Sequence, residues 1–510
     1  MGITNLLDRA VENWPANIAL SYQGQAITYQ TLRADVNSLA KSLMVLGLKK
    51  GDVLGVYLLS NPQFAMLYLA CFRIGVIVSP MSFRLQADDL AYLIDYAKPS
   101  YIFSQSELLS VLLEARPDYQ GWQLALLDKP AQSITKPYVL WDDLLESGTI
   151  LDSEFPSIDA EDPATYFSTS GTTGQPKLVI HQHKQFLYNA EYHAQLLNIT
   201  EQDVSLAPLA ICFNLTFGHQ FMAALYSGST LELMPTFDPL KVLKRIQSKQ
   251  ITLLYMVPAM YSALLNCIPE AQLITHKLRS CIVAGEAVPL ALHQKFKQVF
   301  GLYLSEGIGM SEALFYAINI RQGYKLGSQG PAVIGAEIKI MDEVGEKELA
   351  LNEMGEIWIK SPTILTGYLN KPEQTQKALI NGWLRTGDLG QLDSEAYMWF
   401  RGRINSLILH RGHRIAPIEI EAALYQHPDV LEAAVLGVKA ANGDNNIIAY
   451  VVCKADSVNA PADIQKFVQR TLPDYKWPSL IIPLDNLPRG ISNKIDRRRL
   501  QEMADKQNLV

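Results

Sequence analysis

The segment from Ser168 to Lys177, STSGTTGQPK, constrains the fold of this chain more than any other. Five hydroxyl side chains lie within six of its residues, and its two glycines let a ligand approach the backbone because they carry no Cβ. The apolar runs ATYF before it and LVIH after it predict two buried strands. A hydroxyl-rich turn between two strands is suited to binding a polyphosphate through N–H and O–H donors.

Two other interpretations of this segment have less support. The P-loop of the common nucleoside triphosphatases follows G-x-x-x-x-G-K-[ST] and runs into a helix, whereas no hydroxyl follows Lys177. A flexible Ser/Thr/Gly linker would not need to lie between two apolar runs. By itself the segment indicates a bound phosphate, typically of a nucleotide, and no particular reaction.

The size and charge of the chain exclude several classes of protein. Its 510 residues exceed what one core can hold, so we expect two or more domains. The net charge is −7 and no basic block resembles a nucleic-acid footprint, which argues against a nucleic-acid partner. The five scattered cysteines form no C-x-x-C pair, which is typical of a reducing compartment and argues against structural zinc.

Neither a signal peptide nor a membrane span is expected. Residues 1–15 are typical of the start of an amphipathic helix, and Leu6 occupies the position where a myristoylation signal requires Ser or Thr. The most apolar stretch, residues 64–80, contains Arg73 and a glycine and is too short to cross a bilayer. We therefore expect a cytoplasmic protein. The oligomeric state is almost unconstrained, and a homodimer is compatible with the sequence.

The pattern of elements predicts an α/β protein with a distinct C-terminal part. Strand and helix patterns alternate through the first part of the chain, which predicts sheets covered by helices. From about Gly335, alternating segments such as EIKIMDE and EIWIKS predict an antiparallel β-meander. We expect residues 1–404 to form a large N-terminal domain and residues 405–510 a small α+β C-terminal domain.

Six segments, in this order along the chain, match the motifs of one superfamily. They are STSGTTGQPK (168–177), AGEAVP (284–289), GIGMSEA (307–313), GWLRTGDLG (382–390), RGRINSLILHRGHRIAPIEIE (401–421) and LPRGISNKIDRRRL (487–500). Together they resemble the adenylate-forming superfamily of acyl- and aryl-CoA synthetases, peptide-synthetase adenylation domains and beetle luciferases. The benzoate-CoA ligases look nearest, because residues 213–228 align with their pocket segment without a gap.

The resemblance implies a reaction in two steps. A carboxylic acid attacks the α-phosphate of ATP to give an acyl-adenylate and pyrophosphate, and a thiol then displaces AMP. The thiol belongs to coenzyme A or to the phosphopantetheine of a carrier protein. The first step brings an anion against a polyanion, so cations and fixed donors are required where charge accumulates. In the family the small domain rotates between the two steps, so the C-terminal domain is expected to be mobile.

The resemblance assigns the phosphate side of the site. The β- and γ-phosphates are expected to contact seven loop residues: Thr169, Ser170, Gly171, Thr172, Thr173, Gly174 and Lys177. Glu312 is expected to bind Mg²⁺, which bridges phosphates and neutralises their charge. Ser311 is expected to contact the α-phosphate. Without the motif, Glu312 would read as a surface carboxylate.

The resemblance also assigns the nucleoside and the reacting centre. Asp388 is expected to accept hydrogen bonds from both ribose hydroxyls, and Arg403 to contact the ribose. Gly285 and Glu286 are expected to line the adenine. Lys494 is expected to reach the carboxylate and the bridging oxygen together, although outside the motif it would be one more charge in a basic tail.

A mostly apolar and aromatic set of residues is expected to form the acid pocket, although ordinary core packing uses the same residue types. They are Tyr188, Tyr192, Cys212, Phe213, Asn214, Phe217, Gly218, Val283, Met310 and Ala313. Such a pocket favours a flat or hydrophobic acid. Peptide-synthetase adenylation domains have Asp where this chain has Asn214, so an ordinary α-amino acid is disfavoured.

The hinge and thiol channel are assigned from the same motifs. Asn405 stands at the hinge, where Asp or Lys is usual, and Gly412 is expected to face the thiol channel with Arg411 and Arg414. These arginines suit the phosphates of coenzyme A, but exposed, solvated arginines fit the pattern equally well.

Three further positions depart from the family pattern: Leu178 and Asn493 replace glycines, and Leu409 replaces a lysine. Three hypotheses follow. The first is an acid–thiol ligase that uses coenzyme A, and the second an enzyme that loads a separate carrier protein. The third, motivated by Leu178, Asn405 and Asn493, is an ATP-binding protein with little or no catalysis. Luciferase-type oxidation uses the same fold, but nothing in the sequence singles it out.

Overall fold

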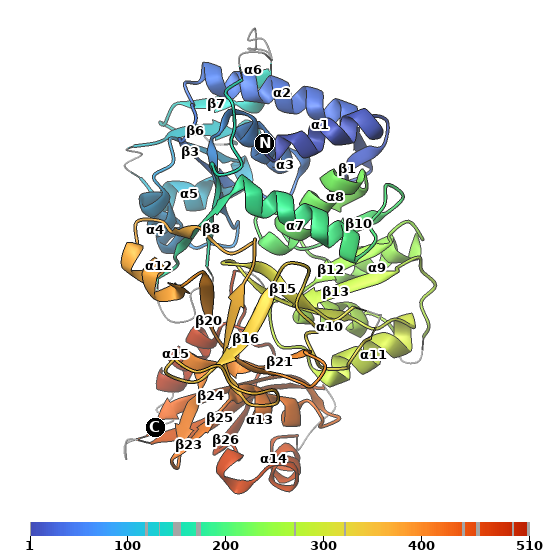
Figure 1. Ribbon diagram of the computed structural model, residues 1–510, viewed down its shortest axis with the longest axis vertical. Helices are drawn as coiled ribbons and strands as arrows, with labels where there is room; N and C mark the ends of the chain where they lie inside the picture. The colour runs from blue at the N-terminus through green and yellow to red at the C-terminus, as the bar shows by residue number, and fades with distance from the viewer. Residues whose placement is uncertain are drawn as a thin grey trace.

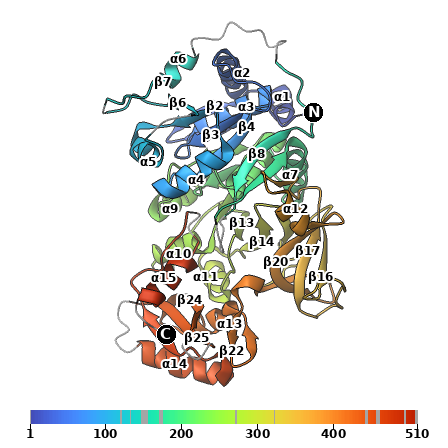
Figure 2. The same cartoon turned by 90° about the vertical axis from the view of Figure 1, so that its left-hand side faces the viewer.

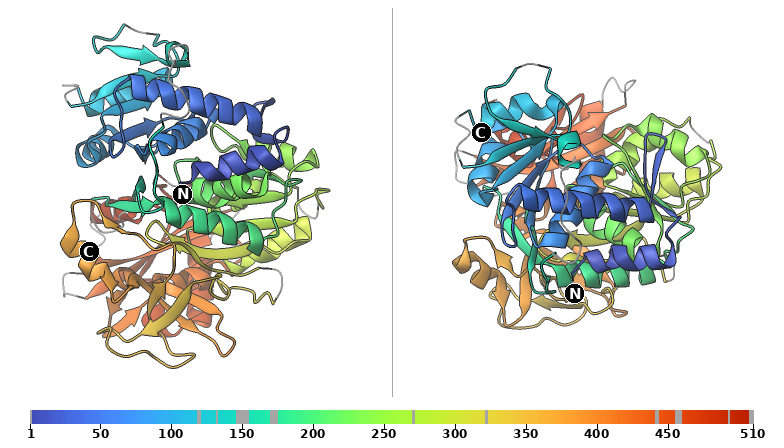
Figure 3. Two further views of the ribbon diagram at one scale, coloured as in Figure 1. Left: turned by 45° about the horizontal axis from the view of Figure 1, so that its top comes forward. Right: turned by 90° about the horizontal axis from the view of Figure 1, so that it is seen from above.

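The computed structural model describes residues 2–117, 121–131, 133–145, 155–169, 175–269, 272–320, 323–440, 444–454, 460–491 and 494–506. Figure 1 shows the C-terminal elements, in red, gathered at one end of the molecule, with the N-terminal elements at the other. The long helix α2 (Tyr29–Val45) lies at the end opposite the C-terminal elements (Figures 1 and 3). None of the described helices combines the length and the apolar character needed to cross a bilayer.

One eight-stranded sheet carries the two predicted strands that flank the 168–177 segment. Its order is β18-β9-β8-β4-β3-β5-β6-β7, and it is parallel from β8 to β7. The strands are β3 (Val53–Tyr57), β4 (Ile77–Met81), β5 (Tyr101–Ser104), β6 (Gln123–Leu126), β7 (Tyr138–Leu140), β8 (Pro163–Ser168), β9 (Leu178–Gln182) and β18 (Gly367–Tyr368). The associated helices are α3 (Pro62–Ile74), α4 (Ala87–Ala97), η1 (Ser106–Leu108), α5 (Leu109–Ala115) and α6 (Trp141–Leu145).

A second eight-stranded sheet has the order β15-β14-β13-β12-β10-β11-β1-β2. Its strands are β1 (Ile18–Tyr22), β2 (Gln25–Thr28), β10 (Val204–Ala207), β11 (Thr230–Leu233), β12 (Leu253–Met256), β13 (Ser280–Ala284), β14 (Ser305–Met310) and β15 (Leu314–Ile318). Its helices are α1 (Thr4–Asn13), α7 (His183–Leu196), the π-helical η3 (Leu215–Phe221), α8 (Met222–Ser227), α9 (Pro239–Gln247), α10 (Pro258–Asn266) and α11 (Leu290–Phe300). The expected βα units are therefore confirmed.

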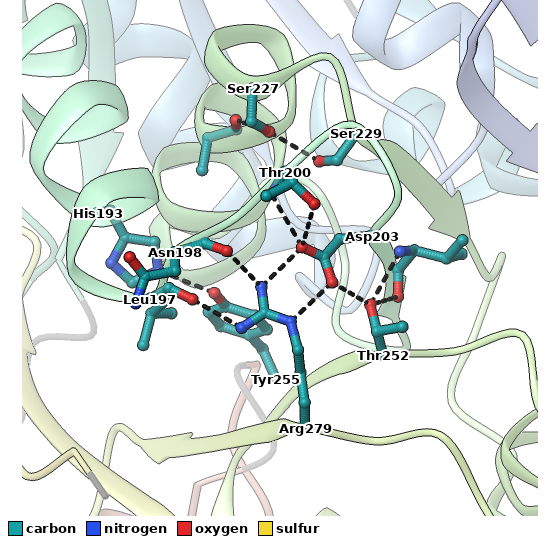
Figure 4. A network of polar contacts seen from close by, with 12 residues as sticks. His193, Leu197, Asn198, Thr200, Asp203, Ser227, Ser229, Thr252, Tyr255 and Arg279 are labelled. Carbon is teal, nitrogen blue, oxygen red and sulfur yellow. Dashed lines mark hydrogen bonds and ion pairs between the residues drawn. The ribbon is translucent and has the colours of Figure 1, made fainter. Parts of the chain in front are cut away.

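A polar network fixes the C-terminal end of α7 to the second sheet (Figure 4). The Arg279 guanidinium donates to both carboxylate oxygens of Asp203, each at 2.7 Å, and to the carbonyl of Leu197 at 2.7 Å. His193, one turn earlier on α7, lies with Nε2 2.9 Å from the hydroxyl of Tyr255 on β12. Because α7 also carries two of the predicted pocket tyrosines, this network sets their position.

The predicted β-meander is confirmed as an antiparallel sheet of β16 (Glu337–Met341), β17 (Gly355–Lys360), β19 (Leu379–Ile380), β20 (Trp383–Leu392) and β21 (Met398–Arg403). The short helix α12 (Pro372–Ala378) lies between β18 and β19 in the chain. The register of β20 and β21 places Asp388 opposite Arg403.

The C-terminal part has its own small sheets and its own apolar clusters. Its elements are η4 (Ile404–Ser406), β22 (Ile408–His410), β23 (His413–Ile415), α13 (Pro417–Leu424), β24 (Val430–Lys439), β25 (Asn445–Cys453), α14 (Ala460–Thr471), η5 (Asp474–Lys476), β26 (Leu480–Pro483) and α15 (Arg497–Lys506). Two apolar clusters draw all their members from residues 408–504. The expected small α+β unit is confirmed, whereas the boundary after residue 404 stays a prediction.

Candidate active site

The base of the 168–177 segment is closed by two hydrogen bonds. The Thr169 N–H donates to the Lys177 carbonyl at 2.9 Å, and the Lys177 N–H donates to the Thr169 hydroxyl at 3.1 Å. Ser170, Gly171, Thr172, Thr173 and Gly174 lie outside the described residues, so their assignment to the phosphates stays a prediction.

The departure at Leu178 has a physical explanation. Leu178 begins β9, pairs with Ser168 on β8 and is only 1% exposed within an apolar cluster of the first sheet. Its carbonyl also accepts from the Leu369 N–H at 2.9 Å, at the end of the edge strand β18. Leu178 is therefore an anchor for the strand that follows the loop.

Lys177 and Glu312 are linked through Tyr368, which the sequence motifs do not include. The Lys177 ammonium lies 4.5 Å from the centre of the Tyr368 ring, a cation–π contact. The Tyr368 hydroxyl donates to Glu312 Oε1 at 3.0 Å, and burial together with this carboxylate raises the pKa of Tyr368. Glu312 is buried, and its second carboxylate oxygen accepts no hydrogen bond from the described residues. A carboxylate oxygen of this kind fits Mg²⁺, which prefers oxygen ligands.

Backbone contacts fix the turn that carries Glu312. The Leu365 N–H donates to the Glu312 carbonyl at 2.6 Å, and the Thr363 hydroxyl donates to the Ala313 carbonyl at 2.6 Å. The Ser311 carbonyl lies 2.7 Å from Nε2 of His181, which must carry the proton because a carbonyl only accepts. Burial lowers the pKa of His181 to about 4, so the ring is neutral.

Asp388 and Arg403 form an ion pair in which a carboxylate oxygen of Asp388 can still accept a hydrogen bond. Arg403 Nε forms an ion pair with Asp388 Oδ1 at 2.9 Å, and Oδ1 accepts no well-aligned hydrogen bond from the described residues. Asp388 is 4% exposed, and burial raises its pKa to about 6, an effect that Arg403 partly offsets. A buried carboxylate oxygen without a donor fits a ribose hydroxyl.

Lys494, from the C-terminal domain, lies beside residues of the large domain. A Cβ placed on Gly285 would be 3.2 Å from Lys494 Cε and 3.7 Å from its Nζ. Burial lowers the pKa of Lys494, and the carboxylates of Glu286, Asp388 and Glu312 oppose this shift. The structure therefore brings the predicted adenylation lysine together with the predicted ribose and magnesium carboxylates.

Gly285 and Glu286 meet the C-terminal domain directly. Gly285 has φ +99°, a conformation that a residue with a Cβ rarely adopts. The Glu286 carboxylate accepts from the backbone N–H of Ile495 at 2.8 Å. The adenine role of this turn stays a prediction, and in the structure its acidic side chain contacts the segment that bears the lysine.

The ten predicted pocket residues fall into two groups. Most are in the core or half-buried: Tyr188, Tyr192, Cys212, Phe213, Phe217, Gly218, Val283, Met310 and Ala313. Phe217 stacks on Tyr68 with ring centres 4.1 Å apart, and Tyr192 donates to the Phe315 carbonyl at 3.2 Å. Phe213 lines a cavity of about 20 Å³ with Ile491 of the C-terminal domain, which is room for about one water molecule.

Asn214 is the exception among these residues. Both polar atoms of its side chain are buried and find no partner among the described residues. It directly precedes the π-helix η3 without capping it, and its Oδ1 lies near Gly218, where an added Cβ would also approach Leu314. Asn214 therefore lies on the side of η3 that is close to Leu314, two residues after Glu312 in the chain. Short π-helical segments are frequent at functional sites.

The predicted hinge and thiol-channel residues lie apart from this group. Asn405 is exposed in η4, and Arg411 and Gly412 form the turn of the β22–β23 hairpin with φ +49° and +78°. Arg411 lies 3.9 Å from Asp474, and Arg414 pairs with Glu343 of the meander.

Leu409 is 53% exposed on the same hairpin, and Asn493 lies outside the described residues. In this structure Lys494 of the C-terminal domain contacts the large domain at Gly285, whereas the arginines of the β22–β23 hairpin pair with Asp474 and Glu343.

Family models match most of the chain. One described as AMP-binding enzyme matches residues 7–369, and one described as AMP-binding enzyme C-terminal domain matches residues 419–494.

Individual proteins are similar over nearly the whole length. The 2-succinylbenzoate–CoA ligase of Bacillus pumilus is 30% identical, over 97% of this chain and 97% of the relative. The solved structure of a benzoate CoA ligase from Burkholderia xenovorans has a TM-score of 0.89 at 25% identity and covers 98% of this chain and 100% of that chain. The o-succinylbenzoate CoA synthetase of Bacillus subtilis with ATP and magnesium ion has a TM-score of 0.84 at 27% identity, covering 97% and 99%.

Proposed function

We propose that this chain, which belongs to the family of AMP-binding enzymes, activates a carboxylic acid with ATP and transfers the acyl group to coenzyme A. The observation that carries the proposal is the position of Lys494. A lysine from the C-terminal domain lies against Gly285, and the carboxylates of Asp388 and Glu312 act on its charge. A cation beside these residues supports the proposal that the anionic acid meets the α-phosphate there.

The residues of the large domain would hold the nucleotide. Asp388 would accept from the ribose hydroxyls through the oxygen that has no donor, and Arg403 beside it would contact the same sugar. Lys177, held over Tyr368, would meet the phosphates at the base of the loop. Glu312 would hold Mg²⁺, which supplies neutralisation of phosphate charge when it is bound.

Lys494 would stabilise charge and would not transfer a proton. The acid enters as a carboxylate, one of its oxygens forms a bond to the α-phosphorus, and pyrophosphate leaves, so the step balances without proton movement. Burial favours the neutral amine, but Glu286, Asp388 and Glu312 favour the ammonium. The ammonium can therefore accompany the developing negative charge through the transition state.

The nature of the acid and of the thiol is proposed from the relatives. The similar proteins named above act on 2-succinylbenzoate or benzoate as CoA ligases. Together with the mostly apolar residues around η3, this supports an aryl or hydrophobic acid and coenzyme A. A carrier-protein phosphopantetheine is the alternative acceptor.

Location and assembly stay hypotheses. All five cysteines are free thiols, which supports the cytoplasm as the compartment. Light scattering tests whether the chain forms a homodimer.

The proposal is tested by product analysis. Purified protein is incubated with ATP, Mg²⁺, benzoate or 2-succinylbenzoate, and either coenzyme A or a holo carrier protein, and AMP and the thioester are measured by mass spectrometry. We expect AMP and an acyl-CoA in equal amounts. Release of AMP only with the carrier protein would show that the carrier protein, and not coenzyme A, is the acceptor. If no acid led to AMP, the protein would instead bind ATP without catalysing this reaction.

A further inference from the structure

The Glu286 carboxylate joins the large domain to the segment that carries Lys494. It accepts from the Ile495 N–H at 2.8 Å, so the hydrogen bond falls on the residue directly after the lysine. Glu286 follows Gly285, which lies against the Lys494 side chain. One turn of the large domain therefore contacts both the side chain of Lys494 and the adjoining backbone.

The residues on either side of Ile495 are hydrogen-bonded within the C-terminal domain. The Gly490 N–H donates to the Lys494 carbonyl at 2.8 Å, and the Asp496 N–H donates to the Pro488 carbonyl at 2.8 Å. These bonds make an antiparallel bridge in which Arg489 pairs with Ile495. The Ile495 N–H takes no part in this bridge and donates instead to Glu286 of the large domain.

The charges around Glu286 match this contact. Burial raises the pKa of the Glu286 carboxyl, and the Ile495 N–H together with the positive charges of Lys494, Arg489 and Arg497, all in the C-terminal domain, partly offsets this rise. A charged acceptor roughly doubles the strength of a backbone hydrogen bond, and a half-buried site protects it from screening. Helix α15 begins just after this segment, at the face of the C-terminal domain turned toward the large domain (Figure 2).

We propose that Glu286 is a positioning residue that holds the C-terminal domain in the arrangement for adenylation, by accepting the Ile495 N–H and so placing Lys494 at the reacting centre. This inference rests on the proposed function. The contact must break when the domain rotates for the thiol step, so Glu286 acts on the first step alone.

Two substitutions and one matched control test the proposal. Glu286→Ala removes the acceptor, whereas Glu286→Gln keeps a neutral one. Glu343→Ala removes a different charged contact between the two parts, the exposed ion pair with Arg414. We expect Glu286→Ala to lower kcat for acid-dependent ATP–pyrophosphate exchange about 10- to 100-fold, with KM for ATP changed less than twofold. Glu286→Gln should fall between, and Glu343→Ala should change kcat less than twofold.

The second step gives the contrasting readout. Each variant is supplied with a preformed acyl-adenylate and coenzyme A, and thioester formation is measured. Glu286→Ala should form thioester as fast as the unmodified protein or faster. In the Lys494→Ala background, Glu286→Ala should cause no further loss of exchange. An increase in KM for ATP of the same size in both backgrounds would mean that Glu286 contacts adenine, which would overturn the proposal.

Hydrogen exchange tests the contact without any catalysis. The Ile495 amide should be protected in the unmodified protein, lose at least tenfold of its protection in Glu286→Ala, and keep most of it in Glu286→Gln. Unchanged protection in Glu286→Ala would overturn the inference whatever the activity. Absence of exchange activity in the unmodified protein, with this protection pattern intact, would instead contradict the proposed function.

Discussion

Replacing Asp388 by Asn should weaken the use of ATP and, at the same time, stabilise the protein without ligand. Asp388 is 4% exposed, and burial raises its pKa to about 6 from an ordinary value of 3.8. The folded protein therefore disfavours the charge by about 2 pKa units, or about 3 kcal/mol. This cost is absent below the unfolded pKa and is present in full above about pH 6, so the carboxylate lowers the free energy of unfolding at neutral pH.

Asparagine has nearly the shape of aspartate and carries no charge. At pH 8, Asp388→Asn should raise the free energy of unfolding by up to about 3 kcal/mol. The substitution also puts an N–H₂ group where ribose hydroxyls need an acceptor, and loss of one charge-assisted hydrogen bond should lower kcat/KM for ATP about 30- to 100-fold.

Calorimetry without ligand and initial rates of ATP–pyrophosphate exchange measure the two effects on the same preparation. We expect the two effects to have opposite signs, with a higher melting temperature and a lower kcat/KM for ATP. A lower melting temperature would mean that Asp388 is a structural partner of Arg403, and an unchanged kcat/KM for ATP would mean that the ribose assignment is wrong.

Three further predictions concern pH, the Glu312 contact and the acid. Because Asp388 protonates below about pH 6, kcat/KM for ATP should fall about tenfold between pH 7 and pH 5, and Asp388→Asn should abolish this part of the pH profile. Tyr368→Phe removes the hydroxyl donated to Glu312, so exchange should fall about tenfold and half-maximal activity should require more Mg²⁺; an unchanged Mg²⁺ titration would contradict this. Asn214→Leu removes two buried polar atoms that have no partner among the described residues, so the ratio of kcat/KM for 2-succinylbenzoate, which carries additional polar groups, to that for benzoate should fall at least tenfold while the melting temperature does not fall. An unchanged ratio would show that Asn214 does not contact the acid.

The sequence motifs predict well where contacts follow from local order. The two apolar runs around the 168–177 segment form strands β8 and β9 as expected. Asp388 and Arg403, fifteen residues apart, face each other because β20 and β21 form a hairpin that pairs them directly. The family resemblance anticipated the class of reaction, since the matching family models and the similar CoA ligases agree with it.

Contacts between distant strands could not be predicted in the same way. Tyr368 acts on Glu312 only because β18 adds to the edge of β9 in the first sheet, and no motif marks either strand for this pairing. Leu178 departs from the family pattern because its side chain is buried on β9, between β8 and β18. This burial arises from the order of strands in the sheet, which no local motif reveals.

The pocket shows the same limit. Phe217 and Val283 share their residue types with any apolar core, and both prove to be fully buried. Asn214 becomes informative only when its two polar atoms are seen to be buried and without partners among the described residues. The residue type alone cannot distinguish a side chain that packs in the core from one that binds a ligand, because the two differ in the atoms around them and not in their chemistry.

ATP–pyrophosphate exchange over a panel of aryl and fatty acids shows whether Lys494 acts at the reacting centre. Arg498 provides the matched control, because it is a cation four residues further on that is mostly exposed and pairs with Glu502. We expect acid-dependent exchange in the unmodified protein, a loss of about 10²- to 10³-fold in Lys494→Ala, and a change of less than twofold in Arg498→Ala. Equal effects of the two substitutions, or full exchange in Lys494→Ala, would contradict this expectation.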